Sequence, residues 1–99
     1  MSSAKRESRQ FLDEAGAIIG TAQYLGDKLD GVSQVFSAGV LIEEAFYVDG
    51  QLHGPYRSFW HSGTAKEEGT FSRGSRVGIY RWYKLDGSLW QEHDYGSAL

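Results

Sequence analysis

Two stretches of this chain decide its fold: Gly50–Arg57, which reads GQLHGPYR, and Gly74–Arg81, which reads GSRVGIYR. The second follows the first at a distance of 24 residues, and the two glycines, the tyrosine and the arginine coincide. The match extends over residues 46–69 and 70–93. Internal periods of this length are typical of stacked supersecondary units. We therefore expect a repeat protein.

A weaker copy of the repeat lies upstream, because Gly26 falls on Gly50 at the same spacing of 24 residues. This first copy has Asp30-Gly31 where the later copies have a glycine followed by Pro55 or Ile79, so it is expected to bend differently. Downstream, Tyr95-Gly96 begins a further unit. The expected repeats span residues 22–45, 46–69 and 70–93, within a domain of residues 15–99.

From Gly26 onward, the glycines are separated by short segments rich in aromatic and β-branched residues. This spacing is typical of an antiparallel β meander, and dipeptides such as Asp49-Gly50 supply the positive φ that tight hairpin turns need. We therefore predict an all-β, mainly antiparallel fold, in which hairpins pair edge to edge into a single sheet. The candidate strands are residues 20–25, 32–37, 40–48, 55–61, 66–72, 77–84 and 88–95.

Residues 1–14 lie outside the repeat and are expected to form an arm or a short helix that ends at Leu12. Apolar residues at helical spacing continue beyond it, so a longer helix is an alternative, which Gly16 and Gly20 oppose. A strand over residues 17–25 is the competing interpretation and the one that we prefer.

Composition excludes several classes of function. The chain has 99 residues and no cysteine, so it has neither a disulfide framework nor a thiolate metal site. A net charge of −3 argues against direct nucleic-acid binding, for which a basic domain is expected. No apolar run approaches the roughly 18 residues that span a bilayer, so we expect a soluble, cytoplasmic protein. Residues 11–50 hold one lysine and seven acids, which suits either a basic partner or a solvated surface.

Residues 47–56, YVDGQLHGPY, resemble the MORN repeat (membrane occupation and recognition nexus), in which an aromatic residue precedes two glycines four residues apart. Phe71, Gly74 and Gly78 repeat this spacing. The sequence His-Gly-Pro-aromatic is similar to the bacterial subtype found in antitoxin-like and immunity-like proteins. The resemblance implies a non-enzymatic, protein-binding module that neutralises or occludes its partner, as an antitoxin, an immunity protein or a phage-type inhibitor. The expected partner is a protein such as a toxin or a nucleic-acid-binding host-defence protein.

The name of the repeat implies an alternative function, which is a membrane-surface or scaffold role on anionic lipid. The C-terminal half carries a modest set of cations that suits this role, at about 1 kcal/mol for each base near an anionic membrane. These cations are Arg57, Arg73, Arg76, Arg81 and Lys84.

Alternation along the strands places aromatic residues on both faces of the sheet. Tyr56, Ser58 and Trp60 are expected on one face, and Arg57 and Phe59 on the other. A small sheet cannot bury both faces, so the N-terminal segment, another subunit or a partner must cover one. Tryptophan and arginine are typical of interface hot spots, although an ordinary core with arginine stacked on rings is the alternative. The candidate partner-binding residues are Arg57, Phe59, Trp60, Arg81, Trp82, Tyr83, Trp90, Glu43 and Glu44.

Catalytic patterns are absent from the sequence. The three histidines have no metal-ligand spacing, and His53 is expected to have a structural role between a turn and a strand. Glu43-Glu44 and Glu67-Glu68 are adjacent pairs, so the two carboxylates of each pair should point to opposite faces. We expect no enzyme activity, no cofactor and no metal. An open edge strand would also allow a homodimer by sheet extension.

Overall fold

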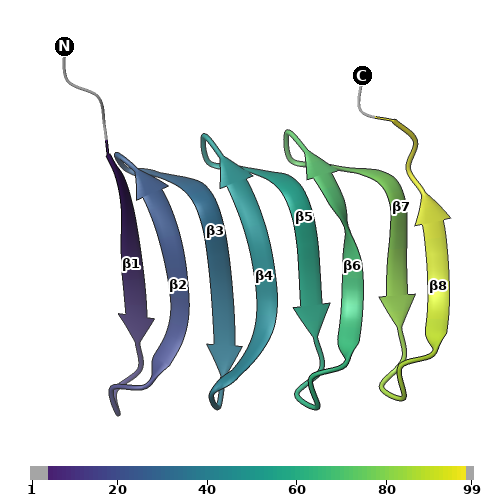
Figure 1. Cartoon of the computed structure of the whole chain (residues 1–99), viewed down its shortest axis with the longest axis horizontal. Helices are drawn as coiled ribbons and strands as arrows, with labels where there is room; N and C mark the ends of the chain where they lie inside the picture. Colours follow the sequence, from purple (N-terminus) through teal and green to yellow (C-terminus); the bar gives the residue numbers. More distant parts are fainter. Residues whose placement is uncertain (1–4, 98–99) are drawn as a thin grey trace.

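The computed structural model describes residues 5–97 as one open antiparallel sheet, with its eight strands in sequence order (Figure 1). The sheet measures 48 × 43 × 13 Å, so it is a single layer. This architecture confirms the predicted all-β hairpin meander, and each of the seven candidate strands has a counterpart. The strands are β1 (Arg6–Leu12), β2 (Ile18–Leu25), β3 (Lys28–Ser37), β4 (Val40–Val48), β5 (Gln51–Phe59), β6 (Ala65–Ser72), β7 (Ser75–Tyr83) and β8 (Leu89–Asp94).

The N-terminal segment is a strand of the sheet, and the expected short helix is wrong. β1 pairs with β2 over its whole length, from Arg6 opposite Leu25 to Leu12 opposite Ile18. The turn between them begins at Asp13, whose carboxylate accepts the backbone N–H of residues 15 and 17 at 2.9 Å. This turn reverses the chain, so the cross-strand ladder prevails over the weak helical pattern. The preferred strand over residues 17–25 is confirmed as β2, whereas residues 1–4 of the expected arm lie outside the described residues.

The first repeat differs from the later ones by one residue. The β3–β4 turn is only Ala38-Gly39, whereas residues 60–64 form a longer turn in which Trp60 N donates to Thr64 O at 2.9 Å. Gly31 (φ 111°) therefore occupies the place of Gly54 (φ 114°), only 23 residues away. The uniform 24-residue alignment is thus wrong for this segment, and Asp30 is the counterpart of His53.

The core consists of aromatic rings stacked along one face of the sheet. We call Tyr56, Phe71, Tyr80 and Tyr95 the aromatic ladder, because their successive ring centroids lie 5.6, 5.9 and 6.1 Å apart in edge-to-face contact. Tyr80 is fully buried. Its ring covers Gly69, where a Cβ atom would lie 2.0 Å from Tyr80 Cδ2. Tyr56 and Tyr80 are 24 residues apart, as are Phe71 and Tyr95, so the two pairs of equivalent residues alternate along the ladder.

Candidate binding surfaces

A hollow of about 400 Å³ lies where β5 and β7 end and β6 and β8 begin, and Trp82 there continues the aromatic face. Trp82 packs on Tyr80 with ring centroids 4.9 Å apart. Four of the predicted partner-binding residues meet here, together with Lys66, Leu85 and Lys84, of which the sequence suggested only Lys84, as a cation for lipid binding. The tryptophan hollow, as we call it, is lined by Trp60, Lys66, Trp82, Tyr83, Lys84, Leu85 and Trp90.

β-Bulges explain how these residues come together. Trp82 pairs with Gln91 and Tyr83 with Leu89, so Trp90 is an extra residue on β8. Lys66 is the corresponding extra residue of β6, between the partners of Ser58 and Phe59. A bulge re-aims side chains and interrupts strict alternation. Strand alternation alone therefore could not place Lys66 in the hollow.

The hollow is apolar with a cationic rim. Trp90 is 63% exposed and Leu85 is also exposed, although both are large apolar side chains. The Lys66 ammonium lies 4.9 Å from the ring centroid of Trp60, in cation–π contact. The indole Nε1 of Trp60 is buried without a hydrogen-bond partner in the described part of the chain. The hollow thus combines unfilled aromatic surface with two lysines, Lys66 and Lys84, and no carboxylate.

The opposite face carries charges in alternating order, and these residues form what we call the charged row. Successive strands pair Glu44 with Arg57, Glu68 with Arg81, and Arg81 with Glu92. Arg57 Nη2 lies 2.8 Å from Glu44 Oε1, and Arg81 Nε lies 2.7 Å from Glu92 Oε2. The row is Glu44, Arg57, Glu68, Arg81 and Glu92, in the order of strands β4 to β8.

Hydrogen bonds within the charged row stabilise its ionised form. The pKa of Glu44 is lowered, chiefly by the hydrogen bond from Arg57 and then by that from Gln34. The pKa of Arg81 is raised by its hydrogen bond to Glu92. Both arginines that the sequence suggested as partner anchors therefore already have carboxylate partners inside the sheet. This engagement favours a structural role for Arg57 and Arg81.

The remaining candidates, Phe59 and Glu43, lie on different faces. The Arg57 guanidinium is 5.4 Å from the Phe59 ring centroid, so Phe59 supports the charged row. Glu43 accepts a hydrogen bond from the Tyr56 hydroxyl at 2.5 Å on the aromatic face. Burial, and then this bond to Glu43, raise the pKa of Tyr56. Glu43 and Glu44 thus point to opposite faces, as predicted.

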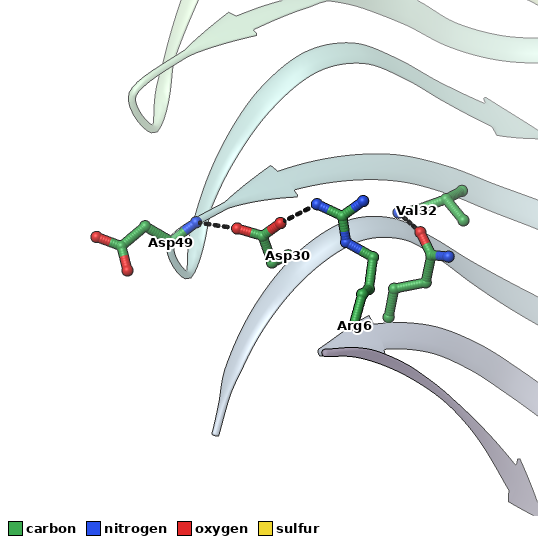
Figure 2. A network of polar contacts seen from close by, with 5 residues as sticks. Arg6, Asp30, Val32 and Asp49 are labelled. Atoms are coloured by element: carbon green, nitrogen blue, oxygen red, sulfur yellow. Dashed lines mark hydrogen bonds and ion pairs between the residues drawn. The ribbon is translucent and has the colours of Figure 1, made fainter. Parts of the chain in front are cut away.

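A polar clamp joins neighbouring turns and accounts for His53. Asp30 accepts hydrogen bonds from the Arg6 guanidinium and, at 3.0 Å, from the backbone N–H of Asp49 (Figure 2). His53 Nδ1 accepts the backbone N–H of Arg73 at 3.1 Å in the same way. The N–H bond from Asp49, and then the bond from Arg6, lower the pKa of Asp30. The predicted structural role of His53 is confirmed, and Asp30 is its equivalent in the first repeat.

Within residues 5–97, no group of three His, Cys, Asp or Glu side chains is arranged to hold a metal ion. His61 Nε2 contacts Ser37 Oγ at 2.9 Å, but this exposed pair joins two turns. Among residues 5–97, no helix is long and apolar enough to cross a membrane.

The chain matches no protein family model, no curated protein and no solved structure. The similarity to the MORN repeat therefore stays a prediction from residues 47–56 and their copies.

Proposed function

We propose that this chain is a non-enzymatic, cytoplasmic protein-binding module whose binding surface is the tryptophan hollow. The observation that carries the proposal is the open hollow itself: the sheet is one layer 13 Å thick, and no described segment lies over these rings. Tryptophan is enriched among residues that dominate binding energy, and such residues cluster in pockets that become fully desolvated on binding. The exposed Trp90 and Leu85 supply the apolar area that a partner would bury.

The rim of the hollow indicates the chemistry of the partner. Lys66 and Lys84 flank the rings, whereas no acidic side chain lines the hollow. Complementary charge favours encounter with the matching partner and disfavours others. We infer that the partner inserts an apolar or aromatic side chain that is flanked by acidic residues.

Three acidic residues of the N-terminal half, Asp30, Glu43 and Glu44, are less suited to partner binding. Asp30 is held by Arg6 and by the Asp49 backbone, Glu44 by Arg57, and Glu43 accepts from the Tyr56 hydroxyl. A carboxylate that already has partners in the sheet is less available to a basic surface.

An antitoxin, immunity or phage-inhibitor role, against a toxin or a host-defence protein, is supported by the MORN-like residues 47–56.

The distribution of cations does not favour the lipid-surface alternative. Arg57 and Arg81 lie in the charged row, paired with glutamates. Arg76 lies on the other face, 4.8 Å from the centroid of Tyr80 and 3.5 Å from Glu67. A membrane is contacted by one surface at a time, so cations divided between two faces cannot act together.

The test is capture of a partner by the full chain, followed by titration of the purified partner. Trp90→Ala removes the most exposed ring of the hollow, and Leu89→Ala is the matched control, because Leu89 is also half-exposed on β8 but does not line the hollow. A hot-spot loss of about 2 kcal/mol weakens the affinity about 30-fold. We expect this loss for Trp90→Ala and near-unchanged affinity for Leu89→Ala. Equal affinity of both variants, or the absence of any stable protein partner in a lysate of the native host, would refute the proposal.

A further inference from the structure

The outer edges of β1 and β8 resemble the two strand edges that pair wherever one hairpin of the sheet meets the next, as at β2–β3, β4–β5 and β6–β7. In residues 5–97, no strand pairs with the outer side of β1 or of β8. Strand direction alternates along the sheet, so β8 of one copy and β1 of another would meet as antiparallel neighbours. We propose that the chain self-associates head to tail, with β1 of one copy extending the sheet beyond β8 of the next. This proposal does not rest on the proposed function.

The hairpin β1–β2 is built like the hairpins β5–β6 and β7–β8. Asp13 N donates to Ala17 O at 2.9 Å and Gly16 N to Asp13 O at 3.0 Å. The same two bonds close the turns at residues 60–64 and 84–88. β1 therefore occupies the place of β3, β5 and β7, each of which lies against the preceding even-numbered strand. The pairing of β8 with a second β1 would be the fourth occurrence of this junction.

The register of the sheet specifies which residues would meet. A continuous cross-strand row begins at Gln10 on β1 and ends at Glu92 on β8. Continuation of this row places Gln10 of the second copy opposite Glu92. The row already contains a bond of this type, since Gln34 Nε2 donates to Glu44 Oε2 at 2.8 Å. The full row is Gln10, Thr21, Gln34, Glu44, Arg57, Glu68, Arg81 and Glu92.

Charge favours unlike edges over like edges. β1 carries Arg6, Glu7 and Arg9, with a net charge of +1, whereas β8 carries Glu92 and Asp94, with a net charge of −2. Arg6 and Glu92 each have a partner within the sheet, in Asp30 and Arg81, so Arg9 and Asp94 contribute most to this difference. Like charges opposite each other destabilise a strand pair, so β8 paired with a second β8 is unfavourable. A junction of unlike edges leaves a free edge at each end of the assembly. Such an interface, when it does not close into a ring, produces an open chain of copies.

Cysteine cross-linking tests the pairing and its register in the full chain. The sequence has no cysteine, so introduced thiols are unique. Because β1 and β8 lie at opposite ends of a sheet 48 Å long, a disulfide between them must join two copies (Figure 1). Chains carrying Gln10→Cys and Glu92→Cys are mixed and mildly oxidised. Random pairing would give about twice as much mixed disulfide as either symmetric disulfide. We expect the mixed disulfide to exceed each symmetric disulfide by well over this ratio, and the double variant to give a ladder of multimers on a non-reducing gel.

The register control replaces Gln10→Cys by Ser8→Cys, which lies on the same face two residues away. Diagonal neighbours are about 7–8 Å apart, which is beyond the usual reach of a disulfide. Ser8→Cys should therefore cross-link poorly to Glu92→Cys. Circular dichroism of each variant checks that the sheet is intact, and sedimentation velocity of the unmodified chain should show mass that rises with concentration and falls with added salt.

Three outcomes would overturn the proposal. The first is a monomer at every concentration. The second is equal yield from the Ser8 and Gln10 variants, which would show random collision. The third is a dominant Gln10–Gln10 or Glu92–Glu92 disulfide, which would show a symmetric dimer instead of a head-to-tail assembly.

Discussion

Gly69 should be intolerant of any side chain, because the ring of Tyr80 lies on it. A Cβ atom at residue 69 would lie 2.0, 2.3 and 2.7 Å from three ring atoms of Tyr80. Backbone strain does not contribute, since the φ of Gly69 is not positive. The ring cannot yield easily, because Tyr80 is fully buried and packs against Phe71, Trp82 and Tyr95.

The loss of stability expected for Gly69→Ala follows from this packing. Overpacking of a filled site costs about 1–3 kcal/mol. A displaced Tyr80 ring would also weaken its edge-to-face packing, which is worth about 0.5–1.5 kcal/mol for each aromatic pair. We expect Gly69→Ala to lower the free energy of unfolding by about 2–4 kcal/mol, which lowers the Tm of a domain of this size by about 8–30 °C. Urea denaturation followed by circular dichroism and by tryptophan fluorescence measures this change.

The preceding repeat supplies a matched control. Ala45 is the counterpart of Gly69, because it lies opposite Tyr56 as Gly69 lies next to Tyr80 in the following repeat. The Cβ atom of Ala45 is accommodated at this buried position. Ala45→Gly should therefore cost only about 1–2 kcal/mol, from the added freedom of the unfolded chain and the loss of one buried methyl group. A Gly69→Ala protein within about 0.5 kcal/mol of the parent would refute the packing of Tyr80 on Gly69, since surface changes have effects of that size.

Three further predictions concern the polar contacts. His53→Ala should lower the free energy of unfolding, measured by urea denaturation, by about 0.5–1.5 kcal/mol, because it removes the acceptor of the Arg73 N–H. His53→Asp should recover part of this stability, because Asp30 accepts the equivalent N–H in the first repeat. The pKa of Asp30 is lower in the folded chain than its unfolded value of 3.8, so the ionised carboxylate stabilises the fold above pH 3.8, and this stabilisation is lost as pH falls through the folded pKa. Asp30→Asn removes the titrating group, so the Tm of this variant should fall less steeply than that of the parent as the solution is acidified. An equally steep fall in Tm would contradict this. A double-mutant cycle with Glu44→Ala and Arg57→Ala should give a coupling free energy of about 0.2–1 kcal/mol. This coupling should decrease as salt is added, because Arg57 is 51% exposed and its charge is screened by ions. A coupling that does not change with salt would instead show that the pair is desolvated.

The strands that follow glycine-containing turns could be predicted from the sequence. The predicted strand at residues 40–48 has the observed bounds of β4, and the turn at Asp49-Gly50 has the positive φ of 52° and 82° that its dipeptide indicates. β1 was missed because Arg6–Leu12 contains no glycine and follows no turn within the repeat. Its signal was Gly16, which is the fourth residue of the turn that begins at Asp13, as Gly63 and Gly87 are the fourth residues of the turns that begin at Trp60 and Lys84.

The tryptophan hollow could be predicted only in part. Composition alone selected Trp60, Trp82 and Trp90, but Lys66 depends on a bulge that shifts the register between Ser58 and Phe59. A one-residue bulge leaves no clear mark in the sequence, because the extra residue is an isoleucine, a lysine or a tryptophan in different strands. These residues are Ile19, Ile42, Lys66 and Trp90.

A single-layer sheet must stabilise each face without a second layer, and the two faces of this protein do so by different means. On one face, the aromatic ladder buries rings against one another and against Gly69. On the other face, the charged row pairs each arginine with glutamates of the adjacent strands. Both devices act between neighbouring strands, so they stabilise the repeat whether or not a partner is bound. The tryptophan hollow is different, because Trp90 and Leu85, each 63% exposed, are the most exposed of the eleven large apolar side chains that lie exposed in residues 5–97. Stability of the sheet does not require this exposure, and for that reason the hollow is the surface that we assign to binding.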